Sequence, residues 1–136
     1  MSQSINLYKQ LARHKLFNKS VNFNLKRIRL ALNLLGRPER KLKNVISVLG
    51  ESGKFTTLFT LKSFIEANKQ KVTTHISPSL RDIRERFYMG DRYLSHKEIK
   101  RTIKQIEKLN IPLTVFECLT LVYIINASKI NADYNI

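Results

Sequence analysis

The stretch "VISVLGESGKFTTLF", residues 45–59, decides how this sequence is interpreted. An apolar run, Val45 to Leu49, leads into a short loop with two glycines, and the apolar pattern that follows has helical spacing. A strand, a glycine loop and a helix in this order are typical of a phosphate-binding loop, because the backbone N–H groups of the loop and of the helix N-terminus converge on one anion. The sequence therefore predicts a strand at Val45–Leu49 and a helix from about Phe55 to Ala67.

The loop itself fits the pattern G-x-x-G-K-x-T, one of the shorter spacings of phosphate-binding loops. Glycines let backbone N–H groups turn toward phosphate oxygens, a lysine neutralises the terminal phosphates, and a hydroxyl lies near the magnesium ion. A plain structural turn is the alternative, because glycine and lysine are also common between strands and helices. The predicted phosphate site consists of Gly50, Glu51, Ser52, Gly53, Lys54, Phe55 and Thr56.

Glu51 is the residue of the loop that fits least well. A carboxylate about 4 Å from a triphosphate would weaken binding by several kcal/mol at an intermediate dielectric constant. The second position of such a loop commonly contributes its backbone to the ligand. We therefore expect the side chain of Glu51 to point away from the phosphates while its amide faces them.

The composition is typical of a globular protein that has one domain and lies in a reducing compartment. With 136 residues, 43% of them hydrophobic, the chain is long enough for a real core but leaves little room for a second domain. Its one cysteine, Cys118, excludes a disulfide framework and a cysteine-based zinc cluster. No apolar run has the length of a membrane span, and the N-terminus has no signal-peptide core. We therefore expect a cytoplasmic protein without membrane contact.

The net charge of +15 is large and uneven, with eleven basic residues but only one acidic residue, Glu39, up to Lys43. Such a bias is typical of proteins that bind nucleic acid, an anionic membrane surface or a polyanionic small substrate. A lysine-rich solvated surface without a specific partner explains it equally well. The charge therefore leaves the partner open.

The other predicted elements follow from helical periodicity, turn residues and two capping boxes, one of Ser95 with Glu98 and one of Thr114 with Glu117. The strand at 45–49, the helix and a second strand make a right-handed βαβ unit, so the sheet should be parallel. The chain ends as a further strand begins, which makes the unit look truncated. The expected elements are a short helix at about 7–16, a turn at 18–20, a helix at 24–35 before Gly36, a basic loop at 37–43, a strand at 71–76, a hairpin turning at 90–91, helices after Ser95 and Thr114, and a strand from about 132.

The remaining candidates for chemistry are interpreted as structural. His14, His75 and His96 lie too far apart in the sequence for a local metal site, and Cys118 lies in an apolar helix as a small core residue. Tyr88 and Tyr93 among arginines suggest base stacking, but the alternation of a hairpin explains them more simply.

Several motifs together resemble the N-terminal part of folylpolyglutamate synthase and of the bifunctional dihydrofolate synthase, which belong to the Mur ligase superfamily. The similarity runs from about Ser20 to the end of the chain, through "NFNLKRIRLALNLLGRPERKLKNVISVLGESGKFTTLFTLKSFIEANKQKVTTHISPSLRDIRERF" and "PLTVFECLTLVYII". The resemblance implies an α/β fold, namely the phosphate-loop central domain of a Mur ligase, with a parallel sheet flanked by helices. Residues 1–136 would be the N-terminal part of this ATP-binding domain, without the C-terminal domain.

The resemblance also implies roles for single residues. The family's loop G-T-N-G-K-G-[ST] falls on residues 50–56, with Lys54 as the phosphate lysine and catalytic residue and Thr56 as the hydroxyl beside magnesium. The family's S-P-H-L, whose serine binds magnesium, falls on Ser77 and the three residues after it, and its N-E-R-I falls on residues 84–87. This sequence departs from the family loop at Glu51, Ser52 and Phe55, where the family has threonine, asparagine and glycine, and from S-P-H-L at Ser79, where the family has histidine.

Two stretches match the family's pteroate-binding segments. Phe116 would be an apolar wall for a pterin ring, although a core position at the start of a helix explains it as well. The glutamate of the family's E-V-G-x-G-G motif, which binds magnesium, would follow Ile136. The residues implied for binding pteroate or folate are Ser20, Val21, Asn22, Phe23, Thr114, Val115, Phe116 and Glu117.

The implied activity is that of an ATP-dependent ligase of folate metabolism. Such an enzyme uses ATP and Mg²⁺ to phosphorylate a folate or dihydropteroate carboxylate, and the amine of glutamate then attacks the acyl phosphate. We expect this chain to be a monomer that is inactive alone, and its charge to serve polyanionic substrates more than nucleic acid. The rival hypotheses are a basic phosphate-loop module that binds nucleic acid and a different small phosphate-loop kinase or NTPase.

Overall fold

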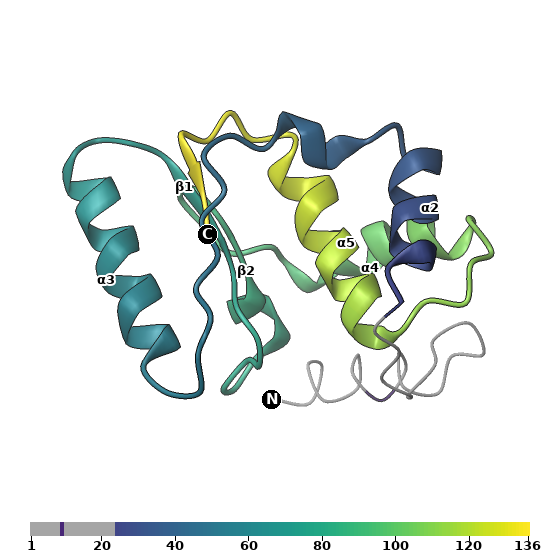
Figure 1. The fold of residues 1–136 in the computed structure, drawn as a ribbon, viewed down its shortest axis with the longest axis horizontal. Helices are drawn as coiled ribbons and strands as arrows, with labels where there is room; N and C mark the ends of the chain where they lie inside the picture. The colour runs from purple at the N-terminus through teal and green to yellow at the C-terminus, as the bar shows by residue number, and fades with distance from the viewer. Residues whose placement is uncertain (1–8, 10–23) are drawn as a thin grey trace.

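The structure is a computed structural model, and it describes Lys9 and residues 24–136. The described chain forms a small α/β domain in three layers, with one helix on one side of a sheet and three helices on the other (Figure 1). Element labels follow Figure 1. The predicted helix at 7–16, apart from Lys9, and the predicted turn at 18–20 lie outside the described residues.

The sheet has three strands in the order β2-β1-β3, with β1 (Val72–His75) in the middle. β3 (Tyr134–Asn135) pairs with β1 in parallel, and β2 (Phe87–Met89) pairs with β1 antiparallel. The expectation of a purely parallel sheet is therefore wrong, because β2 reaches β1 through a short connection instead of a crossover helix. The sheet is mixed, and its parallel part contains β1 and β3.

The predicted strand at 45–49 forms only one bridge to the sheet. Val45 pairs in parallel with Asn135, and the N–H of Ile46 donates to the Asn135 carbonyl at 2.8 Å. Beyond this point no described backbone lies beside the segment to continue the ladder, so Leu49 is 88% exposed. The prediction of a full strand at 45–49 is therefore wrong in extent, although the side chains of Ile46 and Val48 still pack inward against α3 and the sheet.

One helix, α3 (Lys54–Ala67), covers one face of the sheet. Its Leu58 and Ile65 are buried against Val72 and Ile76 of the β1 region, with Phe55 and Leu61 packed at the margin. The other side chains on this helix are mostly small or apolar and lie outward. The helix agrees with the predicted bounds within one residue.

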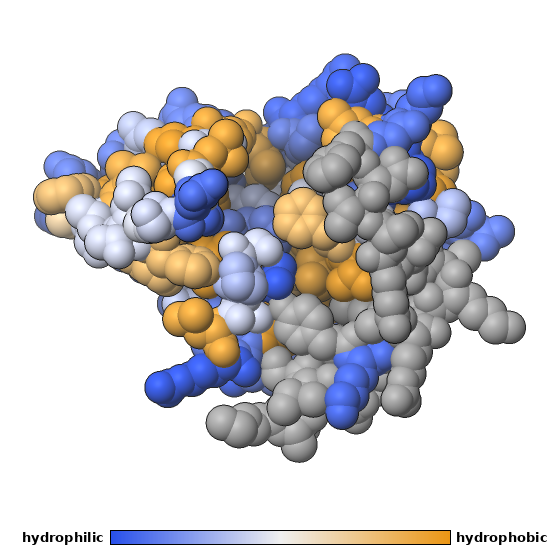
Figure 2. Space-filling view, turned by 60° about the horizontal axis from the view of Figure 1, so that its bottom comes forward, coloured by the Kyte–Doolittle hydropathy of each residue, from blue (hydrophilic) through white to orange (hydrophobic). Residues whose placement is uncertain are grey.

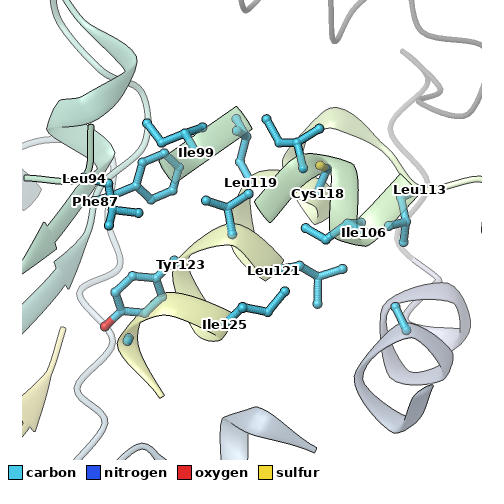
Figure 3. Packing of buried hydrophobic residues seen from close by; sticks show 14 of the residues in the cluster. Phe87, Leu94, Ile99, Ile106, Leu113, Cys118, Leu119, Leu121, Tyr123 and Ile125 are labelled. Atoms are coloured by element: carbon cyan, nitrogen blue, oxygen red, sulfur yellow. The ribbon is translucent and has the colours of Figure 1, made fainter. Parts of the chain in front are cut away.

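The opposite face of the sheet is covered by α2 (Lys26–Leu34), α4 (His96–Glu107) and α5 (Val115–Ala127). α5 is apolar on all sides because it contacts α2, α4, the short helix η1 (Pro38–Lys41), β1 and β2. Figure 3 shows how side chains from these elements fill the larger core around α5. Its largest fully buried members are Phe87, Ile83, Ile99, Ile106, Leu113, Leu119, Leu121 and Val122.

Both predicted capping boxes are confirmed and fix the starts of α4 and α5. The predicted hairpin is confirmed too, since Tyr88 and Tyr93 pair antiparallel across the turn. A second short helix, η2 (Ile83–Arg86), precedes β2. Within the described part of the chain, no helix is long and apolar enough to cross a membrane.

Candidate phosphate-binding site

The glycine loop joins the segment at 45–49 to α3, and two of its residues need to be glycine. Gly50 has a φ of 146° and Gly53 a φ of 75°, values that L-residues with a side chain rarely adopt. Gly53 is the N-cap of α3 and has no side chain, so no side chain caps the first turn of the helix. Because the first N–H groups of a helix have no intrahelical partner and carry the positive end of the dipole, they are free to bind an anion.

Lys54, the first residue of α3, folds back over this loop. Its ammonium group donates to the carbonyl of Gly50 and, at 3.1 Å, to the carbonyl of Glu51. These bonds hold a full positive charge beside the N-terminus of the helix. The lysine thus closes the loop at the N-terminus of α3.

The other loop residues are placed as follows. Glu51 and Ser52 are exposed, and so is Thr56 in the first turn of α3. Phe55 is half-buried against the cluster under α3, which gives it a packing role where the family pattern has glycine. That the carboxylate of Glu51 points away from a bound phosphate stays a prediction.

α3 is held on the sheet by a polar network as well as by its apolar face. The hydroxyl of Tyr88 donates to Glu66 at 2.7 Å, and the ammonium of Lys62 lies 2.8 Å from the same carboxylate and 4.1 Å from the centre of the Tyr88 ring. Burial, followed by the bond to Glu66, raises the pKa of Tyr88 to about 12. This network fixes the helix, and with it the loop at the N-terminus of the helix, relative to β2.

Ser77, the residue implied as a magnesium ligand, follows the end of β1. Its hydroxyl accepts a hydrogen bond from the guanidinium of Arg86 at 3.2 Å, and its peptide bond to Pro78 is cis. The carbonyl of Arg86 lies 3.1 Å from Nδ1 of His75. Burial lowers the pKa of His75 to about 4, and the charge of Arg86 acts in the same direction, so this imidazole is neutral at pH 7.

Arg86 falls within the stretch that matches the family's N-E-R-I, but the resemblance gave it no role in the site. It is buried at the end of η2, and its side chain reaches Ser77 because β2 runs antiparallel to β1. The register pairs His75 with Phe87, which brings residues 86 and 77 close together. This contact depends on the register of β2 against β1, which the predicted hairpin at residues 90–91 does not determine.

Of the two stretches implied to bind pteroate, residues 20–23 lie outside the described residues. In the second, Thr114 caps α5, and the carboxylate of Glu117 accepts from the Thr114 N–H at 2.7 Å and pairs with Arg27 at 3.3 Å. Val115 packs at the edge of the larger core. Phe116 is 59% exposed, so its interpretation as a core residue is wrong and its ring is open to a ligand.

The glycine loop, the loop after β1 and the start of α5 all lie at the lower end of the molecule in Figure 1. Figure 2 turns this end forward, and hydrophobic side chains gather there over the left of the face and in its middle. The glycine loop follows the segment that bridges β3 in parallel, and the loop after β1 follows a strand that pairs with β3 in parallel. The carboxyl ends of parallel strands are where α/β sheets bind ligands. The fold thus places the predicted phosphate segment and the described one of the two predicted substrate segments at one end of the domain.

The residues at this end fit the phosphates of a nucleotide better than an isolated metal ion. Within residues 24–136 no group of three or more His, Cys, Asp or Glu side chains is placed to hold a metal. The implied magnesium ligands, Thr56 and Ser77, are neutral hydroxyls, and Ser77 also contacts a guanidinium. Mg²⁺ at nucleotide sites keeps several waters and is bound through few protein oxygens and the phosphates. Neutral hydroxyls such as these would suit a magnesium ion that is held mainly by the phosphates of a nucleotide.

Comparison with solved structures finds one kind of enzyme. The chain matches the bifunctional folylpolyglutamate synthase/dihydrofolate synthase of Yersinia pestis complexed with AMPPNP and Mn, with a TM-score of 0.85 and 25% identity over 97% of this chain. It matches E. coli FolC in complex with DHPP and ADP with a TM-score of 0.86 and 28% identity, also over 97% of this chain. The folylpolyglutamate synthase of Thermotoga maritima, 20% identical, shares the fold with a TM-score of 0.80.

These matches have a limited extent, because the chain spans about a third of the length of each of these enzymes. No protein-family model matches the sequence, and no curated protein matches it either. The resemblance first noted in the motifs is nevertheless confirmed by the structure: this chain has the fold of about one third of a folylpolyglutamate synthase/dihydrofolate synthase.

Proposed function

We propose that this chain is a phosphate-loop domain of the Mur ligase type that binds Mg-ATP through residues 50–56. The observation that supports the proposal is the glycine loop, in which Gly53 leaves the N-terminus of α3 without a side-chain cap and Lys54 places its ammonium over the loop carbonyls. Similar enzymes in complex with ADP or with AMPPNP and Mn support the same ligand. The uncapped N–H groups, the helix dipole and Lys54 would together hold the terminal phosphates.

The activity proposed for the enzyme to which such a domain belongs is ATP-dependent ligation of glutamate to folate or dihydropteroate. Magnesium, bound with the nucleotide near Thr56 and Ser77, would supply charge neutralisation for the phosphates. Lys54 would stabilise the negative charge that develops as the terminal phosphoryl group moves to a substrate carboxylate. The exposed ring of Phe116 would offer an apolar surface to the pterin, at the same end of the domain.

Mass spectrometry of a reaction mixture tests the proposal and separates it from its rival. The chain is incubated with Mg-ATP, dihydropteroate and glutamate, and in parallel with Mg-ATP alone. We expect nucleotide binding but no folyl product, because the chain spans about a third of the similar ligases. Release of ADP and phosphate from Mg-ATP alone, with neither folate nor glutamate present, would favour a small NTPase over a ligase domain.

A further inference from the structure

One face of α4 carries a row of five cations that the proposed ligase chemistry does not use. Lys97, Lys100, Arg101, Lys104 and Lys108 are all exposed, and α4 lies with α5 on the side of the sheet away from α3 (Figure 1). With 3.6 residues per turn, these side chains lie within an arc of about 100° on the helix. They form what we call the α4 basic stripe.

The stripe has no acidic partners. The ion pairs of the described residues join acids to basic residues elsewhere, and none of the five stripe cations has an ion pair with a described residue. The two glutamates of α4 lie at the margins of the stripe, where Glu98 is bound by Arg92 and Ser95 and Glu107 is half-buried. Among the described residues, none neutralises the charge of the stripe through an ion pair.

The spacing within the stripe is unfavourable for an isolated helix. Lys97 with Arg101, Lys100 with Lys104, and Lys104 with Lys108 are neighbours four residues apart, and like charges at this spacing repel one another. Alternating Glu and Lys would stabilise the same exposed face. The repulsion is relieved when an external polyanion supplies the negative charge.

We propose that the α4 basic stripe binds the phosphate backbone of nucleic acid, without reading its sequence. From residue 97 to residue 108 a helix rises about 16 Å, which spans about five nucleotides at 3.4 Å per nucleotide along one strand. A continuous row of cations on a convex helix matches a linear row of phosphates. This site is separate from the glycine loop, so it adds a partner to the proposed nucleotide binding and does not depend on it.

A membrane surface fits the stripe less well than nucleic acid does. Amphipathic helices that bind bilayers insert their apolar face between the lipids. The apolar side of α4 is not available for insertion, because Ile99, Ile103 and Ile106 are buried in the core. Only the charged face is exposed, which favours a partner that is bound through charge alone.

The test measures fluorescence anisotropy of labelled 20-base-pair duplex DNA and of a 20-nucleotide single-stranded RNA from 50 to 200 mM KCl. If the five cations neutralise five phosphates of duplex DNA, affinity should fall about 500-fold over this range. The double variant Lys100→Gln/Lys104→Gln keeps three cations of the stripe, so its affinity for duplex DNA should fall only about 40-fold over the same range of KCl concentration. Gln keeps helix propensity and removes repulsion, so circular dichroism and the melting temperature should show an unchanged fold.

A matched double variant controls for net charge. Arg40→Gln/Lys41→Gln removes two exposed cations from η1 and should leave the salt dependence within error of the wild type. Lys54→Ala should also leave nucleic-acid binding unchanged. The proposal would be overturned by equal losses of nucleic-acid affinity in the α4 and η1 variants. It would also be overturned by binding to phosphatidylserine vesicles but not to nucleic acid, or by the absence of nucleic-acid binding at 50 mM KCl.

Discussion

Lys54 and Gly50 are joined across the loop that they close: the ammonium of the lysine donates to the carbonyl of the glycine four residues earlier. This contact keeps the cation at the N-terminus of α3 even without a ligand. A phosphate that enters the loop would find the lysine, the helix dipole and the uncapped N–H groups already in place.

Gly53→Ala should destabilise the fold by about 1 kcal/mol, because alanine at a φ of 75° adopts a left-handed conformation that costs L-residues about this much. Urea unfolding measures the change, with Ser52→Ala at the neighbouring exposed position as the control. If Gly53→Ala were as stable as Ser52→Ala, the left-handed N-cap of α3 would be contradicted.

Glu51→Thr should tighten Mg-ATP binding about fivefold, or about 1 kcal/mol, because an exposed carboxylate that points away from the phosphates still repels them through water. Phe55→Gly is expected to lose stability instead, because glycine weakens the first turn of α3 and the half-buried ring leaves its cluster. Calorimetric titration of Mg-ATP measures nucleotide binding by Glu51→Thr, and urea unfolding measures the stability of Phe55→Gly. Unchanged or weaker nucleotide binding by Glu51→Thr would show that its carboxylate does not oppose the phosphates.

Ser77→Ala should weaken binding of Mg-ATP but leave binding of magnesium-free ATP unchanged, because the hydroxyl is the implied contact to the metal. Ser79→Ala, two residues later, serves as the matched control and should bind both forms like the wild type. A loss of equal size in the two nucleotide forms would assign Ser77 to the support of Arg86 instead.

Glu98→Gln should remove a pH-dependent part of the stability. Hydrogen bonds from Arg92 and then Ser95 lower the pKa of Glu98 from 4.5 to about 2 in the folded chain. The contribution of Glu98 to the free energy of unfolding is therefore fully present above about pH 4.5 and is lost as the pH falls toward 2. We expect wild type and variant to differ by about 1 kcal/mol at pH 7, because Glu98 is half-buried but its partner Arg92 is exposed to water. Urea unfolding at pH 7, 4.5 and 3 should show the difference shrinking, and a constant difference would contradict the assignment.

Local signals in the sequence predict most of the helices well. The capping boxes at Ser95 and Thr114 and the helical apolar spacing place α4 and α5 correctly, because each depends on residues a few positions apart. Strand pairing depends on distant partners. For this reason the antiparallel pairing of β2 with β1 and the single bridge at Val45 were not predicted.

The candidate site shows the same difference between local contacts, which short motifs predict, and contacts between distant segments, which they do not. The loop and Lys54 could be identified from spacing alone, since all their contacts are local. The bond of Arg86 to Ser77 depends on the register of two strands, and the exposure of Phe116 depends on how α5 packs. Neither is encoded in a short motif, so only the three-dimensional structure shows them.

Calorimetric titration of Mg-ATP into the wild-type chain and into Lys54→Ala, with Lys41→Ala as the exposed-lysine control, shows whether residues 50–56 hold the phosphates of the nucleotide. Losing a charge-assisted contact to phosphate should weaken binding by Lys54→Ala about tenfold to a hundredfold. Lys41→Ala should bind like the wild type. Equal affinity of Lys54→Ala and the wild type, or no binding by either, would contradict the assignment of residues 50–56 as a nucleotide phosphate site.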